Sequence, residues 1–326
     1  MDIKNYLENY QKNILQTFIN AINNKRISHA YLLSGENGMP LKESAIFFAK
    51  SLLCEHPNPL ACSSCETCRK IDDGSYYDLL LLDGEDSKIK KGDIDKIESQ
   101  FDKTALNNKG VMVYIINLVE NMMPAAVNSL LKFLEEPGEN VFAFLTTENE
   151  SKVLPTILSR TQILHFKIVK KELIINDAIN EGVNLEDALI LSNFYSNPSQ
   201  IKLISESNDY VLIKKTISEL LEALDEGMQE AMYFTSKNID PVFKNNKQVK
   251  LFLKMLSTIF KDMLSYKLKQ PILVKSFENI YTNLVSKLPN IDKNVMLIMS
   301  MMTKLDYNVN TSLLFDHLIY SICEEC

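Results

Sequence analysis

The sequence predicts an α/β domain followed by an all-α region. Five short apolar runs alternate with helical patterns in the first half, which is typical of a parallel sheet covered by helices on both faces. From residue 170 onward only helical periodicity continues. Seven of the nine glycines lie before residue 139, so the tight turns concentrate in the first half as well.

Strands are expected where apolar residues follow one another, and helices where they recur every three or four residues. A first amphipathic helix is expected over Tyr10 to Asn24, before the first strand. The length of 326 residues allows two or three domains. The expected strands cover 30–33, 79–82, 111–116, 141–145 and 163–166, and the expected helices between them cover 41–53, 93–101 and 124–136.

The composition excludes several classes of protein. Hydrophobic residues make up 46% and charged residues 24%, as in ordinary globular proteins. We expect no signal peptide and no membrane helix, and six cysteines in such a chain indicate a cytoplasmic protein that binds metal. The formal net charge of −7 argues against a free-standing nucleic-acid binder, but not against contact with nucleic acid inside a larger assembly.

The segment after the first strand has the layout of a phosphate-binding loop but lacks its functional groups. In the motif G-x-x-x-x-G-K-[ST] counted from Gly35, the last three positions are Pro40, Leu41 and Lys42. Proline offers no N–H, leucine carries no charge, and lysine cannot ligate magnesium as a hydroxyl would. Counting from Gly38 does not restore the motif. We therefore expect no ATP hydrolysis by this chain.

The second half of an ATPase site is altered too. A buried strand ending in Asp-Glu normally supplies an aspartate for the metal ion and a glutamate that polarises water. Here the corresponding strand ends in Asn117-Leu118, which can do neither task well. Losses in both halves indicate a nucleotide site that is no longer used. The alternatives are an unrelated strand–helix turn, or a motor ATPase that uses Lys42 in an unusual geometry.

Four cysteines after the second expected helix predict a metal site. Cys54, Cys62, Cys65 and Cys68 lie within fifteen residues, and two C-x-x-C steps sharing a cysteine suit tetrahedral zinc. Four thiolates leave no open position for water, so such a zinc ion is structural. Free thiols or a redox pair are the alternative reading.

Residues near these cysteines receive supporting roles. Arg69 and Lys70 directly follow the last one, and their charge would offset that of a zinc–tetrathiolate centre. His56 is a competing ligand, although four cysteines already complete the site. Near the C-terminus, Cys323 and Cys326 are expected to be surface thiols.

A later segment carries a resemblance to a known family. Residues 128–137 read NSLLKFLEEP, and Ser159-Arg160-Thr161 follows downstream. Together with the four-cysteine insert, they resemble the motifs N-A-L-L-K-x-L-E-E-P and S-R-C of bacterial clamp-loader subunits. These AAA+ proteins load the sliding DNA clamp for DNA polymerase III. The departures from the motifs are Ser129 and Thr161.

The resemblance implies three parts, and it rests on motifs for residues 1–205 but only on length and helicity beyond them. A RecA-like AAA+ domain would cover 1–166, with a zinc module at 54–68. A small helical lid would cover 167–207, and a helical collar domain that mediates oligomerisation would cover 208–326.

The resemblance also implies a function. Within this family the gamma and tau motor subunits keep the phosphate-loop lysine and the Asp-Glu pair, whereas delta prime subunits keep the zinc module and the Ser-Arg motif without a working ATP site. The sequence is similar to the second kind: a stator of the DNA polymerase III holoenzyme that is no enzyme on its own. The implied partners are the gamma or tau subunits, the delta subunit, and, in the assembled complex, the sliding clamp and primed DNA.

By the same resemblance, Arg160 is an arginine finger that acts in trans on ATP bound to the neighbouring motor subunit. It would neutralise charge on the γ-phosphoryl group in the transition state. An ion-paired surface arginine is the plain alternative. A different class of function, a zinc-dependent nucleic-acid-binding module unrelated to replication, would show tight and strongly salt-dependent DNA binding by the chain alone.

Two helical patterns complete the prediction. In the helix that contains the LEEP motif, Lys132, Glu135 and Glu136 lie off the apolar stripe and are expected in solvent or at a subunit interface. The methionines near the C-terminus are expected in the core of the collar domain. They are Met296, Met299, Met301 and Met302.

Overall fold

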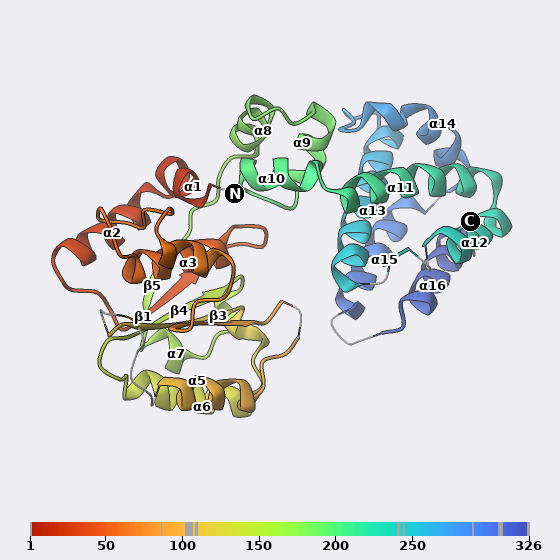
Figure 1. Cartoon of the computed structure of the whole chain (residues 1–326). Coiled ribbons are helices and arrows are strands. Elements are labelled where there is room, and N and C mark those ends of the chain that lie inside the picture. Colours follow the sequence, from red (N-terminus) through yellow and green to blue (C-terminus); the bar gives the residue numbers. More distant parts are fainter. Residues whose placement is uncertain are drawn as a thin grey trace. The chain divides into compact units, whose positions relative to one another are not determined.

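A parallel sheet lies at the centre of the first half of the chain (Figure 1). Its order is β2-β3-β4-β1-β5, and every neighbouring pair is parallel. All five strands lie within two residues of their predicted bounds, so the five predicted strands are confirmed. The strands are β1 (Ala30–Ser34), β2 (Leu79–Asp83), β3 (Met112–Asn117), β4 (Val141–Thr147) and β5 (Gln162–His165).

The computed structural model describes residues 2–85, 87–101, 107, 110–239, 242–243, 245–288, 290–305 and 309–324. The chain divides into two units, one ending at Lys170 and the other beginning at Lys171. Within the described residues, no helix has both the length and the apolar character needed to cross a membrane.

Helices cover both faces of the sheet because successive strand residues point to opposite faces. Tyr31 and Leu33 of β1 join one core cluster, whereas Ala30 and Leu32 join the other. The first cluster is closed by α1 (Ile3–Tyr10), α2 (Lys12–Asn23), α3 (Leu41–Leu53) and α4 (Glu66–Asp72), and the second by α5 (Lys91–Phe101), α6 (Pro124–Glu135) and α7 (Pro155–Leu158).

The described part of the second unit is entirely helical, so the predicted fold class, α/β followed by all-α, is confirmed. The long helix α13 packs against α11, α14 and α15. The finer division into a lid and a collar stays a prediction. The helices are α8 (Lys171–Asn180), α9 (Leu185–Leu191), α10 (Pro198–Ser205), α11 (Asn208–Glu226), α12 (Met228–Phe234), α13 (Asn246–Lys267), α14 (Glu278–Lys287), α15 (Ile291–Lys304) and α16 (Thr311–Glu324).

The prediction that the C-terminal methionines lie in the core is wrong for two of them. Met296 is 73% exposed and Met299 is 45% exposed, whereas Met301 is buried. Helix α15 buries one stripe at a spacing of three, which contains Val295, Ile298 and Met301. Met296 and Met299 each lie one position beyond that stripe and therefore face solvent.

Candidate functional site

The end of the degenerate phosphate loop packs into the hydrophobic core. Leu41, the first residue of α3, is only 3% exposed and belongs to the same core cluster as Met39. A Cβ atom added to Gly35 would lie 2.8 Å from the sulfur of Met39 and 3.0 Å from Cδ2 of Leu41. The position where an active loop carries its lysine is therefore occupied by a buried apolar side chain.

Lys42 is committed to two carboxylates of its own chain. Its Nζ donates to Asp83 Oδ2 at 3.0 Å and to Glu85 Oε2 at 3.2 Å. Asn117 Nδ2 donates to Asp83 Oδ1 at 2.8 Å, and Thr146 Oγ1 donates to Asn117 Oδ1 at 2.7 Å. This network lies at the carboxyl edge of the sheet, where ligands bind in open α/β folds. An internal ammonium group thus offsets part of the negative charge at this edge.

The network shifts both ionisation equilibria toward the charged forms. Burial alone would lower the pKa of Lys42, but the hydrogen bond to Asp83 and the charges of Glu85 and Asp83 outweigh it and raise that pKa. Burial alone would raise the pKa of Asp83, but hydrogen bonds from Asn117, the Glu85 amide and Lys42 lower it. The contribution of Lys42 to stability is therefore lost only as pH rises through its raised pKa. That of Asp83 is lost only as pH falls through its lowered pKa, so both are present at neutral pH.

Replacing Lys42 with methionine is expected to lower the free energy of unfolding by about 1–2 kcal/mol at pH 7. The substitution removes the positive charge between Asp83 and Glu85 and leaves these two acids close to a third, Glu43. Burial raises the pKa of Glu43. Urea unfolding measures the change. The matched control is Lys152→Met at an exposed position, for which we expect a change within about 0.5 kcal/mol. Equal losses in the two variants would show that the network does not stabilise the fold.

Arg160 lies at the opposite, amino edge of the sheet. It occupies the turn between α7 and β5, near the segment that enters β1. At about 3.3 Å per residue, the five residues of β1 separate the two edges by about 13 Å. The guanidinium group is therefore remote from the phosphate loop of its own chain.

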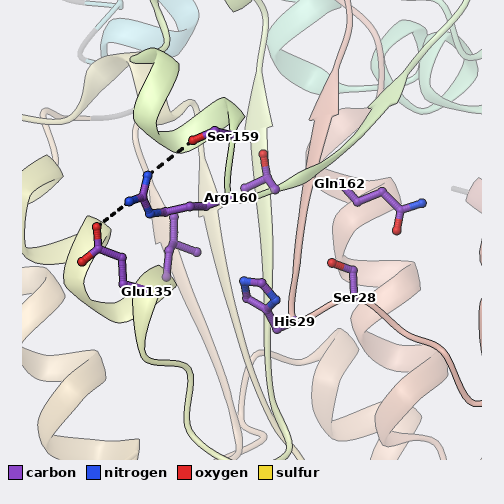
Figure 2. Close-up of a pocket in the computed structure, with 8 residues that line it drawn as sticks. Ser28, His29, Glu135, Ser159, Arg160 and Gln162 are labelled. Atoms are coloured by element: carbon purple, nitrogen blue, oxygen red, sulfur yellow. Dashed lines mark hydrogen bonds and ion pairs between the residues drawn. The ribbon is translucent and has the colours of Figure 1, made fainter.

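The guanidinium group of Arg160 is held by three contacts within the chain. Nη2 donates to Glu135 Oε1 at 2.6 Å, and Nη1 donates to the Thr156 carbonyl at 2.9 Å and to Ser159 Oγ at 3.4 Å. Figure 2 shows the group between Glu135 and Ser159. It borders an open hollow of about 670 Å³. The lining residues are Ser28, His29, Leu134, Glu135, Ser159, Arg160, Thr161 and Gln162.

Several residues of this hollow carried no signal in the sequence. Ser28 and His29 precede β1, and they meet Arg160 because β1 and β5 are neighbours in the sheet. Nε2 of His29 is buried and has no hydrogen-bond partner within the described residues. Only the strand order brings these residues together, and the spacing of residues along the chain does not reveal it.

The four cysteines come together as predicted from their spacing. All four sulfur atoms lie within 4.8 Å of one another. Sγ of Cys54 lies 3.5 Å from that of Cys62 and 3.8 Å from that of Cys65, and the sulfurs of Cys62 and Cys68 are 4.0 Å apart. Zinc–sulfur bonds of about 2.3 Å in a tetrahedron give sulfur–sulfur separations of about 3.8 Å. The cluster can therefore hold a metal ion, and its geometry suits zinc.

Backbone donors surround the sulfur atoms. The amides of Cys62, Cys65 and Cys68 donate to the sulfurs of Cys54, Cys62 and Cys65 at 3.3–3.4 Å. The amide and hydroxyl groups of Ser64 lower the pKa of Cys62 to about 5, whereas burial raises the pKa of Cys54 and of Cys68.

The residues named around the cluster have the following places, and the supporting role of Arg69 and Lys70 stays a prediction. Lys70 forms an ion pair with Glu66 at 2.7 Å. His56 is outside the group of four ligands and lines the adjacent groove. Cys323 is of intermediate exposure, and Cys326 lies outside the described residues.

Known proteins share both the sequence and the fold. Residues 10–170 match the family model described as DNA polymerase III, delta subunit. DNA polymerase III subunit delta' of Bacillus subtilis (strain 168) is 30% identical over 318 residues, which cover 96% of each chain. Subunit tau of the same organism is 30% identical over 300 residues, which cover 79% of this chain but 49% of that protein.

A solved structure shows the same fold. A DNA polymerase III gamma subunit-related protein from Thermotoga maritima aligns with a TM-score of 0.55 and 19% identity, and the match covers 95% of this chain and 99% of that one. The sequence matches extend the likeness from fold to family, since the delta' relative aligns over nearly its whole length. The chain belongs to the family of DNA polymerase III delta prime subunits.

Proposed function

We propose that the chain is a non-motor stator of the DNA polymerase III clamp loader and that it supplies Arg160 in trans to ATP on a neighbouring motor subunit. The observation that carries the proposal is the position of Arg160 on the sheet. It lies at the amino edge, whereas the degenerate nucleotide loop lies at the carboxyl edge of the same sheet. An arginine so far from its own loop can serve only a nucleotide held by another chain.

The use of arginine at position 160 supports this role. Only three of the 35 basic residues are arginine, namely Arg26, Arg69 and Arg160. Arginine presents a planar fork of donors that matches phosphate oxygens, whereas lysine acts as a point charge. Arg160 borders an open hollow. An arginine in such a place suits the recognition of a phosphoryl group.

The assembly would include further components. Its partners in this proposal are the gamma or tau motor subunits and the delta subunit, and the assembled complex would act on the sliding clamp and primed DNA. Residues 167–207 would form the lid, and residues 208–326 the collar that joins the subunits. A structural zinc ion bound by the four cysteines would stabilise the segment that leaves α3.

Nucleotide titration separates the stator from a motor ATPase of the same family. We expect calorimetry of the isolated chain with Mg-ATP to show no binding at micromolar concentrations, because Leu41 is buried and Lys42 is paired with Asp83 and Glu85. A gamma or tau subunit serves as the positive control. Micromolar affinity that disappears in a Lys42→Ala variant would instead support a motor ATPase.

A further inference from the structure

Within the described residues, the Arg160 side chain donates three hydrogen bonds. One of them is to a charged group, the carboxylate of Glu135. Its Oε1 accepts from Nη2 at 2.6 Å, and the two side chains are 50% and 33% exposed. The ion pair therefore joins the last turn of α6 to the turn before β5 at the open rim of the hollow (Figure 2).

The place of Glu135 on its helix is unfavourable for a carboxylate. It is the last residue of α6, where the helix dipole presents negative charge. A cation nearby offsets this cost, and Arg160 provides that cation. Within the described residues, the Glu135 carboxylate forms its hydrogen bond and ion pair with Arg160, the proposed finger.

The two ends of the guanidinium group are held differently. Nη1 donates to the Thr156 carbonyl, one of the carbonyls that α7 leaves without a partner in its own helix, and to Ser159 Oγ. These two acceptors lie in α7 and in the turn after it. They are uncharged, so they attract the guanidinium group less strongly than a phosphate would. Among the described residues, Nη2 donates to Glu135 alone. The Nη1 contacts can thus persist while Nη2 changes partner.

We propose that Glu135 is a positioning residue that keeps the arginine finger paired until the γ-phosphate of a neighbouring subunit's ATP displaces it. This inference rests on the proposed role of Arg160. The carboxylate and the phosphate are both anions that use the same donor, so they compete for Nη2. The contacts of Nη1 keep the arginine aimed at the rim during the exchange. The cost of breaking a partly exposed ion pair appears as a weaker apparent affinity for ATP, by about 2- to 5-fold.

Glu135→Gln tests the competition because it keeps the size of the side chain and removes its charge. The experiment uses the reconstituted clamp loader and the ATP turnover that depends on Arg160, taken as the difference from an Arg160→Ala complex. We expect the KM for ATP of this component to fall about 2- to 5-fold with kcat unchanged. The matched control is Glu136→Gln, the adjacent exposed acid, which should change neither constant.

The outcomes separate the two proposals. If Arg160→Ala leaves turnover unchanged, the role of Arg160 itself is wrong. If Arg160→Ala lowers turnover, the role of Arg160 is supported. If Glu135→Gln then leaves KM unchanged or lowers kcat, the competition by Glu135 is rejected. In the Arg160→Ala background, Glu135→Gln should have no effect. An effect there would show that Glu135 acts through a contact other than Arg160.

Discussion

ATP turnover at the nucleotide site facing Arg160 is expected to fall by about three orders of magnitude in the Arg160→Ala variant. Negative charge spreads over the γ-phosphoryl oxygens in the transition state, and a guanidinium group neutralises it better there than in the ground state. The whole complex then loses the share of turnover that this site contributes. Steady-state ATPase of reconstituted wild-type and variant complexes measures the loss.

Folding and assembly are expected to survive the Arg160→Ala substitution. The Arg160 side chain is one-third exposed, and its ion pair joins two exposed segments. Loss of the ion pair should therefore lower the melting temperature only slightly. Arg160→Lys keeps the charge without the fork and should retain only part of the activity. Arg26→Ala removes another exposed arginine of the same unit and should behave as wild type. Unchanged turnover in an assembled Arg160→Ala complex would reject the finger.

The two edges of the sheet carry side chains with different surroundings. At the carboxyl edge, Leu41 is buried and Lys42 forms ion pairs with Asp83 and Glu85, so the edge contributes to stability. At the amino edge, Arg160 remains half-buried and accessible beside an open hollow. A parallel sheet fixes both edges with the same strands. The core that contains Leu41 therefore also supports the turn that carries Arg160.

The fold could be predicted because the inner strands of the sheet are buried on both faces. Every residue of β1 and β3 is buried, so each strand appears in the sequence as an uninterrupted apolar run. The loss of the phosphate loop was equally visible, since it depends on residue types at fixed positions such as Pro40 and Leu41. The metal cluster was visible for the same reason, because four ligands within one short segment define their own site.

Features that depend on distant contacts could not be predicted. Helix α1 has eight residues, too few for a clear period, and it ends at the buried Gln11. The Gln11 amide donates to the carbonyl of Lys167 at 2.8 Å and accepts from the amide of Lys167 at 2.9 Å. These residues are 156 positions apart. Likewise, Glu135 was expected only in solvent or at an interface, because its partner Arg160 lies 25 positions away.

Removal of the metal is expected to have a large effect on the stability of the first unit. Cys54 and Cys68 belong to the core cluster that contains α3, together with Leu60 and Ile71. A zinc ion would join four chain positions between α3 and α4, so its loss should cost about 4 kcal/mol or more. We expect about one equivalent of zinc per chain after stringent dialysis. Thermal unfolding with and without a strong chelator measures the loss.

Substitution of single cysteines distinguishes a metal centre from free thiols. Cys62→Ser should remove the bound zinc and lower the melting temperature as much as the chelator does, and the chelator should then have no further effect. Cys323→Ser, at a cysteine of the second unit outside the group of four, is the matched control and should keep both the metal and the stability. Because ligands must be deprotonated, zinc affinity should fall as pH falls. Absence of zinc from protein purified under reducing conditions without chelator would contradict the site. So would an unchanged melting temperature in the Cys62→Ser variant.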